Sequence, residues 1–196
     1  MYSERVKLAA AGPVAALAAL AALAGRPGAA RAESEQALSV GLGWATFSTV
    51  GQAMGNMQPP SLSPTVGGSL GLSYERLVGT DFALRAELVG GLFYGGADAK
   101  QRQSKISNAL LADAGISFRF DVLKYVPYAF AGLGAVTAGG GPIERGTGLV
   151  LVVGGGLDWL RSRSRSYGVE ARLASFGGDV TVITAGVRGT VRWGYF

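Results

Sequence analysis

Residues 82–94, with the sequence FALRAELVGGLFY, alternate between two kinds of side chain. The even positions, from Phe82 to Tyr94, carry Phe, Leu and Tyr together with Ala and Gly, whereas the odd positions include Arg85 and Glu87. Successive side chains of a β-strand point to opposite faces, so this period of two predicts a strand with one apolar and one polar face.

The same alternation recurs along the chain after residue 32, and no segment there keeps a helical period for long. Six more strands are expected, within 38–45, 69–75, 109–120, 149–159, 167–174 and 183–195. An eighth is expected within 126–137, but its phase is ambiguous, because Tyr128 and Phe130 favour one face while Leu133 favours the other. Eight strands occupy almost all of residues 33–196, which predicts a single all-β domain.

The expected connections differ in length. They are long at 49–65, 95–104 and 138–147, short at 79–81 and 121–125, and of middling length at 161–166; the short one at 177–180 is an exception. Long connections at one end and short turns at the other are typical of transmembrane β-barrels.

The polar face combines small residues with equal numbers of acids and arginines, which favours an enclosed lumen over a water-facing surface. Unpaired buried charges cost several kcal/mol each, and the forked guanidinium suits buried carboxylates better than lysine does. We therefore expect a lumenal charge network of Glu75, Arg85, Glu87, Asp113, Arg119, Asp158, Glu170, Arg172, Arg188 and Arg192.

The opposite face carries no charge in mid-strand, and its aromatic residues gather near strand ends. Aromatic girdles of this kind mark the two interfaces of a membrane barrel. The predicted interface aromatics are Trp44, Tyr74, Tyr94, Trp159, Trp193 and Tyr195. The pattern predicts a closed antiparallel eight-stranded transmembrane β-barrel, in preference to a soluble lipocalin-like barrel with an apolar interior.

Residues 1–32 have the features of a secretory signal peptide. Arg5 and Lys7 precede an Ala/Leu-rich stretch from Leu8 to Leu23, and residues 30–32 have the Ala-x-Ala form that signal peptidase accepts. The stretch is short and weakly hydrophobic for a bilayer, which favours a cleaved signal peptide over a retained anchor. The barrel domain is then expected to comprise residues 33–196.

Composition argues against most soluble-enzyme mechanisms. The chain has no Cys and no His, so thiol nucleophiles, thiolate metal sites and the usual general base are missing. Much of the net charge of +5 lies in residues 1–32, which argues against nucleic-acid binding. The glycine runs at 139–141 and 154–156 are not followed by the Gly-Lys-Ser/Thr of a phosphate loop. We expect no catalytic residues, cofactor or metal.

The sequence resembles the OmpA/OmpX-type eight-stranded outer-membrane β-barrels, which are porin-like proteins of the Gram-negative cell envelope. The similarity lies in Pro127-Tyr128 followed by Gly132-Leu133-Gly134, and in the aromatic-rich end Val191 to Phe196. It implies an integral outer-membrane protein with both termini in the periplasm, surrounded by lipid and lipopolysaccharide. It also implies a C-terminal assembly signal of Trp193, Tyr195 and Phe196, read by the barrel-assembly machinery after transit with periplasmic chaperones. Here Tyr195 has the lipid-facing parity, whereas in the family the terminal Phe usually has it.

Four interpretations of the sequence are considered. The favoured one is a non-enzymatic structural or surface-interaction role performed by external loops, whose partner the sequence does not name. The alternative is a narrow channel for small solutes or ions. A lipid-modifying enzyme and a soluble periplasmic barrel are less favoured.

Overall fold

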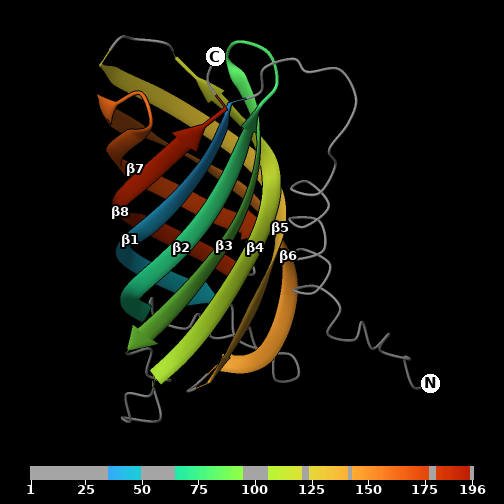
Figure 1. The fold of residues 1–196 in the computed structure, drawn as a ribbon. Helices are drawn as coiled ribbons and strands as arrows, with labels where there is room; N and C mark the ends of the chain where they lie inside the picture. Colours follow the sequence, from blue (N-terminus) through green and yellow to red (C-terminus); the bar gives the residue numbers. More distant parts are fainter. Residues whose placement is uncertain are drawn as a thin grey trace, which may run out of the picture.

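A closed barrel of eight antiparallel strands forms the described part of the protein (Figure 1). The computed structural model describes residues 35–49, 65–94, 106–120, 124–140, 143–176 and 180–194. The strands are β1 (Gln36–Thr49), β2 (Thr65–Leu77), β3 (Phe82–Tyr94), β4 (Ile106–Arg119), β5 (Tyr125–Gly140), β6 (Ile143–Ser162), β7 (Arg165–Phe176) and β8 (Val180–Trp193). This confirms the predicted fold class. In the part of the chain described, no helix is long and apolar enough to span a membrane.

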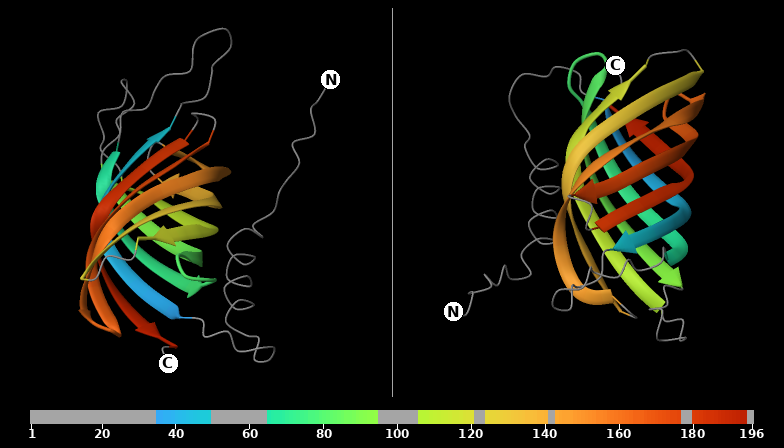
Figure 2. Two further views of the ribbon diagram at one scale, coloured as in Figure 1. Left: turned by 90° about the horizontal axis from the view of Figure 1, so that it is seen from above. Right: turned by 180° about the vertical axis from the view of Figure 1, so that it is seen from behind.

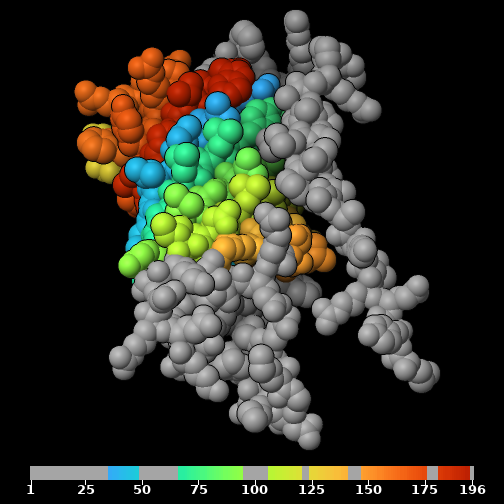
Figure 3. Space-filling view, turned by 90° about the horizontal axis from the view of Figure 1, so that it is seen from below, coloured from blue at the N-terminus to red at the C-terminus, as the bar shows by residue number. Residues whose placement is uncertain are grey.

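Each strand pairs with its neighbours in the sequence, and β1 pairs with β8 to close the sheet. The strands run obliquely around the barrel, as views from above and from behind show (Figure 2). In the space-filling view, β8 (red) lies beside β1 (blue), and the green strands that follow β1 in the sequence come next across the visible face (Figure 3). This order leaves no strand edge open among the described residues.

The two ends of the barrel differ in their connections. The β2–β3, β4–β5 and β6–β7 connections lie at one end, here called the short-turn end, where β1 also begins and β8 ends. The other four connections join strand ends at the opposite end, here called the long-connection end, where β1 ends at Thr49 and β2 begins at Thr65, and β3 ends at Tyr94 and β4 begins at Ile106.

Two predicted connections are wrong in length. Residues 138–147 are mostly strand, because β5 continues to Gly140, β6 starts at Ile143, and pairs such as Thr137 with Thr147 extend the ladder. Residues 161–166 likewise reduce to a turn at Arg163 and Ser164. Both segments lack apolar alternation, yet backbone hydrogen bonds keep them in the sheet, with register shifts between Ala138 and Gly140 and between Leu160 and Ser162.

The apolar face of the sheet points outward. Leu42, Leu133 and Leu149 are 64%, 70% and 72% exposed, whereas Glu75 and Asp158 are 2% and 1% exposed. This distribution contradicts the soluble-barrel alternative, which requires the opposite arrangement. It also resolves the phase of β5, since Tyr128 and Phe130 are buried inside the barrel while Leu133 lies outside.

The interior has two layers. Toward the long-connection end lies an apolar layer of Ala45, Phe47, Val89, Phe93, Leu111, Val136, Val150, Val152, Ala174 and Val182. Within it the Phe47 and Phe93 ring centroids are 5.8 Å apart. Toward the short-turn end the buried side chains are mainly charged or polar. Alternating strand residues therefore build a membrane-compatible outside and a filled inside.

Candidate functional site in the lumen

Arg85 is the centre of the lumenal ion pairs. It lies on β3 two positions from Glu87, so both side chains enter the lumen. Its Nη2 donates to Glu87 Oε2 at 2.7 Å and to Glu170 Oε2 at 2.9 Å, and its Nη1 donates to Glu75 Oε1 at 3.3 Å. One guanidinium thus connects side chains from β2, β3 and β7.

Arg172, Arg188 and Arg192 extend this set of ion pairs around the barrel. Arg172 Nη2 lies 2.5 Å from both Glu87 Oε1 and Glu170 Oε1. Arg188 binds Asp158 with two hydrogen bonds: its Nε donates to Oδ1 at 2.9 Å and its Nη2 donates to Oδ2 at 2.8 Å. Arg192 Nη2 donates to the same Oδ2 at 2.9 Å. Bidentate charge-assisted pairs of this kind are stronger and geometrically more specific than single hydrogen bonds.

Glu35, which the sequence reasoning missed, joins the network at the short-turn end. Arg119 Nη1 donates to Glu35 Oε1 at 3.0 Å, and Arg119 Nη2 donates to Glu75 Oε2 at 2.6 Å. Arg192 Nε also lies 3.5 Å from Glu35 Oε1. Glu35 directly precedes β1 and continues its inward parity, a signal that the sequence contained.

Asp113 is the exception among the predicted network residues. The structure brings together Glu75, Arg85, Glu87, Arg119, Asp158, Glu170, Arg172, Arg188 and Arg192 in ion pairs. Asp113 is buried with them, but it forms no ion pair with a described residue, and its Oδ2 has no hydrogen-bond partner. In the β3–β4 ladder it lies opposite Glu87.

Two aromatic rings of β5 line the same layer, each beneath a guanidinium. The Arg85 Cζ lies 3.9 Å from the Phe130 ring centroid, and the Arg188 Cζ lies 4.0 Å from that of Tyr128. Such cation–π contacts stabilise charges that have lost their water. Tyr128 also donates its hydroxyl hydrogen to Glu170 Oε2 at 2.8 Å.

Gly154 and Gly156 leave room for these rings. They pair across the β5–β6 ladder with Phe130 and Tyr128, and a Cβ at either glycine would overlap the ring opposite. Gly154 and Gly156 of the glycine run at 154–156 therefore serve packing inside the barrel. The sequence showed that this run is not a phosphate loop. It did not show which side chains need the space, because that depends on the register between β5 and β6.

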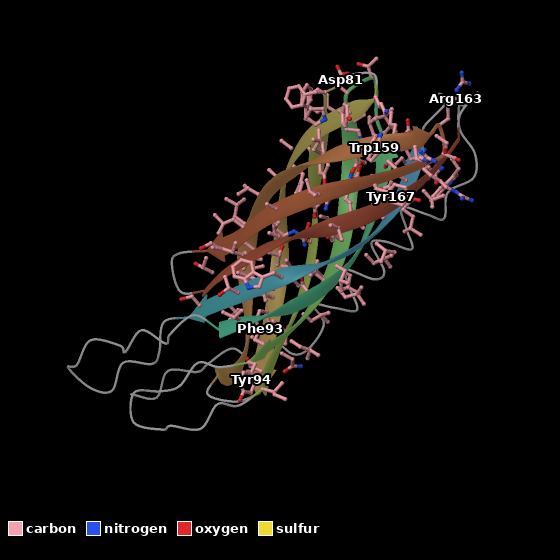
Figure 4. All side chains as sticks on the ribbon, turned by 90° about the vertical axis from the view of Figure 1, so that its left-hand side faces the viewer. Asp81, Phe93, Tyr94, Trp159, Arg163 and Tyr167 are labelled. Atoms are coloured by element: carbon pink, nitrogen blue, oxygen red, sulfur yellow. The ribbon has the colours of Figure 1, made fainter. Side chains whose placement is uncertain are left out.

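The predicted interface aromatics divide between the two ends. Trp159 and Trp193 are exposed near the short-turn end, Trp44 and Tyr94 are exposed toward the other, and Tyr74 is half-buried and donates to Gln36 Oε1 at 3.0 Å. Figure 4 shows Trp159 near Arg163 and far from Tyr94. The residues Tyr195 and Phe196, and with them two-thirds of the predicted C-terminal assembly signal, lie outside the described residues, as does the predicted signal peptide at 1–32.

The lumenal carboxylates are mostly paired with arginines. Most of the lumenal carboxylates already accept hydrogen bonds from arginine, which suits ion pairing better than proton transfer. Within the described ranges, no three Asp or Glu side chains are placed to hold a metal ion together.

No protein-family model matches the sequence, and no curated protein does. Solved structures do match. The outer membrane protein OprG from Pseudomonas aeruginosa is similar with a TM-score of 0.59 and 9% identity over 81% of this chain and 96% of that one. Neisserial surface protein A is similar with a TM-score of 0.55 and 16% identity, over 81% of this chain and 95% of that one. Ail of Yersinia pestis, solved with the heparin analogue sucrose octasulfate, is similar with a TM-score of 0.52 and 16% identity, over 82% of this chain and 99% of that one.

These neighbours are eight-stranded outer-membrane β-barrels, and at such low identity the likeness establishes the fold. The fold is consistent with the OmpA/OmpX-type resemblance seen in the sequence.

Proposed function

We propose that this protein, which has the fold of the eight-stranded outer-membrane barrels, is an integral outer-membrane protein of a Gram-negative bacterium. Its role is non-enzymatic and is structural or performed by the connections at the long-connection end. The exposed apolar exterior supports this location, because the hydrocarbon region of a bilayer accepts apolar side chains and penalises charges.

The filled lumen is the observation that carries the proposal. Arg85, Arg172 and Arg188 bind carboxylates from several strands across the interior, and the apolar layer lies beyond them. Beside Arg172 and Arg188 the lumen holds a cavity of about 40 Å³. That is room for a few water molecules. A larger pocket of about 280 Å³ lies at the short-turn end, and none of the residues of the apolar layer lines it. A continuous path for solutes would have to cross that layer, so a passive structural role fits better than the channel alternative.

The residue content supports the non-enzymatic part of the proposal. The chain has no His and no Cys, and nearly all lumenal acids are occupied by arginines. Buried carboxylates held in such pairs are poorly suited to exchange protons with a substrate. A lipid-modifying enzyme would need an accessible nucleophile with a base beside it.

The proposed orientation places the short-turn end in the periplasm. Both β1 and β8 have their free ends there, and barrels inserted from the periplasm keep short turns on that side. Outer-membrane lipid and lipopolysaccharide then surround the barrel. Periplasmic chaperones and the barrel-assembly machinery are its partners during biogenesis.

Two measurements on the protein expressed in a Gram-negative host test the proposal. The unboiled protein should migrate differently from the boiled protein in SDS gels, because a folded membrane barrel resists SDS. Reconstituted in planar bilayers, it should give no unitary conductance steps, with a known porin as the positive control. Loss of the gel shift would contradict the membrane barrel, whereas regular conductance steps would favour the channel.

A further inference from the structure

A pocket of about 280 Å³ opens at the short-turn end of the lumen. Three guanidinium side chains line it, from Arg119 on β4, Arg163 in the β6–β7 turn and Arg192 on β8. One acid, Glu35, lines it with them. Arginines from three separate segments therefore converge on one cavity, which is a geometry suited to an anion with several oxygens.

Glu35 occupies only part of this pocket. Its Oε1 lies 3.0 Å from Arg119 Nη1 and 3.5 Å from Arg192 Nε. Arg192 is 5% exposed, and within the described part of the chain its Nε has no hydrogen-bond partner. Arg163 forms no ion pair with any described residue. Among the described residues, the Glu35 carboxylate therefore leaves the Arg192 Nε without a hydrogen bond and the Arg163 guanidinium without an ion pair.

We propose that this pocket binds a phosphate group, and that Glu35 holds the place of the anion when the ligand is absent. A terminal phosphate carries about −1.5 to −2 charges and three acceptor oxygens, against a single charge and two oxygens for a carboxylate. It can therefore accept from Arg163, from Arg119 Nη1 and from Arg192 Nε, while Arg119 Nη2 and Arg192 Nη2 stay bound to Glu75 and Asp158. The inference goes beyond the proposed function, since it needs the folded barrel but neither a loop partner nor a particular orientation.

The other walls of the pocket specify the rest of the ligand. Leu77, Val126 and Leu160 contribute apolar surface, and Thr80 also lines the pocket. The volume exceeds that of a phosphate ion, so an organic group attached to the phosphate can pack against these side chains. The ligand is a phosphate monoester, either free in the surrounding solution or carried as the headgroup of a lipid.

Calorimetric titration of the full chain, expressed in a Gram-negative host and purified in a nonionic detergent, tests the proposal. The titrants are phenyl phosphate, a soluble phosphate monoester, for the free source and dihexanoyl phosphatidic acid for the lipid source, at constant ionic strength with chloride as the blank. Saturable binding of either one supports the site, and the tighter of the two identifies the source. Absence of saturable binding by both the parent and Glu35→Gln would overturn it.

Three variants separate a specific site from general attraction. Glu35→Gln should tighten binding by about fivefold, the effect of removing one partly exposed competing charge. Arg163→Gln should weaken binding, whereas Arg161→Gln, which removes the same charge from an exposed position two residues away, should not. Equal weakening by both arginine variants, or no change with Glu35→Gln, would contradict the proposal. Heat-shifted gel mobility establishes that every variant is folded, so a failed titration is distinguishable from a failed barrel.

Discussion

Asp113 lies directly opposite Glu87 in the β3–β4 ladder, so two acidic side chains are cross-strand neighbours inside the barrel. Glu87 accepts hydrogen bonds from Arg85 and Arg172, whereas Asp113 has no ion pair with a described residue. Like charges opposite one another in a sheet are destabilising. The two acids should therefore respond differently to neutral isosteres.

Asp113→Asn should leave the free energy of unfolding unchanged or raise it by about 0.2–1 kcal/mol, because it removes a like charge and no ion pair. Glu87→Gln should lower it by about 3–5 kcal/mol, because Arg85 and Arg172 lose a buried partner. Urea unfolding in detergent, followed by tryptophan fluorescence, measures both. A large loss with Asp113→Asn would mean that this side chain has a stabilising partner.

Arg85→Ala should destabilise the barrel by about 3–5 kcal/mol, since it leaves Glu75, Glu87 and Glu170 short of one buried cation. The double variant with Glu87→Ala should cost less than the sum of the two single changes, because the pair is removed together. Arg161→Ala, an exposed arginine, is the control and should have little effect. If the single and double variants unfold like the parent, the ion pairs do not stabilise the barrel.

Gly154→Ala should destabilise by about 1–3 kcal/mol, because the new methyl group would overlap both the Phe130 ring beneath Arg85 and the backbone carbonyl oxygen of Ala171. Gly148→Ala is a matched control on the same strand and parity, where nothing lies within 4 Å of the added Cβ. Thermal unfolding followed by gel mobility compares the two. Equal midpoints for both variants would show that the Phe130 ring and the neighbouring backbone can shift without cost.

Alternation was sufficient to predict the fold, because a period of two sorts side chains between lipid and lumen without any knowledge of contacts. It could not give the phase of β5, where Tyr128 and Phe130 are large and apolar yet face inward. That placement depends on their cross-strand partners Gly156 and Gly154 and on the arginines above them. Register, which sequence periodicity does not specify, decides such cases.

The sequence predicted which residues form the candidate charge network better than it predicted which of them pair with one another. Parity put ten residues on one face, but it did not reveal that Asp113 would face Glu87 or that Glu35 would bridge Arg119 and Arg192. The hairpin at 138–147 was missed for a related reason. Its residues pair through their backbones, so they show no side-chain pattern.

Leu133→Arg should prevent stable insertion or cost about 2–4 kcal/mol, because Leu133 lies in the middle of β5 on the exposed apolar face. Val78→Arg, at the exposed β2–β3 turn, is the control and should be tolerated. The folded fraction after refolding into phospholipid vesicles measures the difference. Equal folding of both variants would contradict a bilayer around the strands.

Trypsin applied to intact cells should cleave after Lys100 or Arg102 and spare the Arg163–Ser164 turn, as expected if the short-turn end is periplasmic. After the outer membrane is permeabilised, the turn should become accessible. Mass spectrometry of the fragments identifies the sites. Cleavage at Arg163 on sealed cells would mean that the proposed orientation is inverted.

The pairing of β1 with β8 constrains the order in which the barrel assembles. The Ser39 and Thr190 hydroxyls hydrogen-bond at 2.8 Å across this seam although 151 positions separate them in the chain. Until the last strand arrives, the first strand has an unsatisfied edge, and an open edge is not stable within hydrocarbon. The seam therefore makes closure the final event of biogenesis, and the first strand must be shielded from aggregation for as long as the rest of the polypeptide takes to follow it.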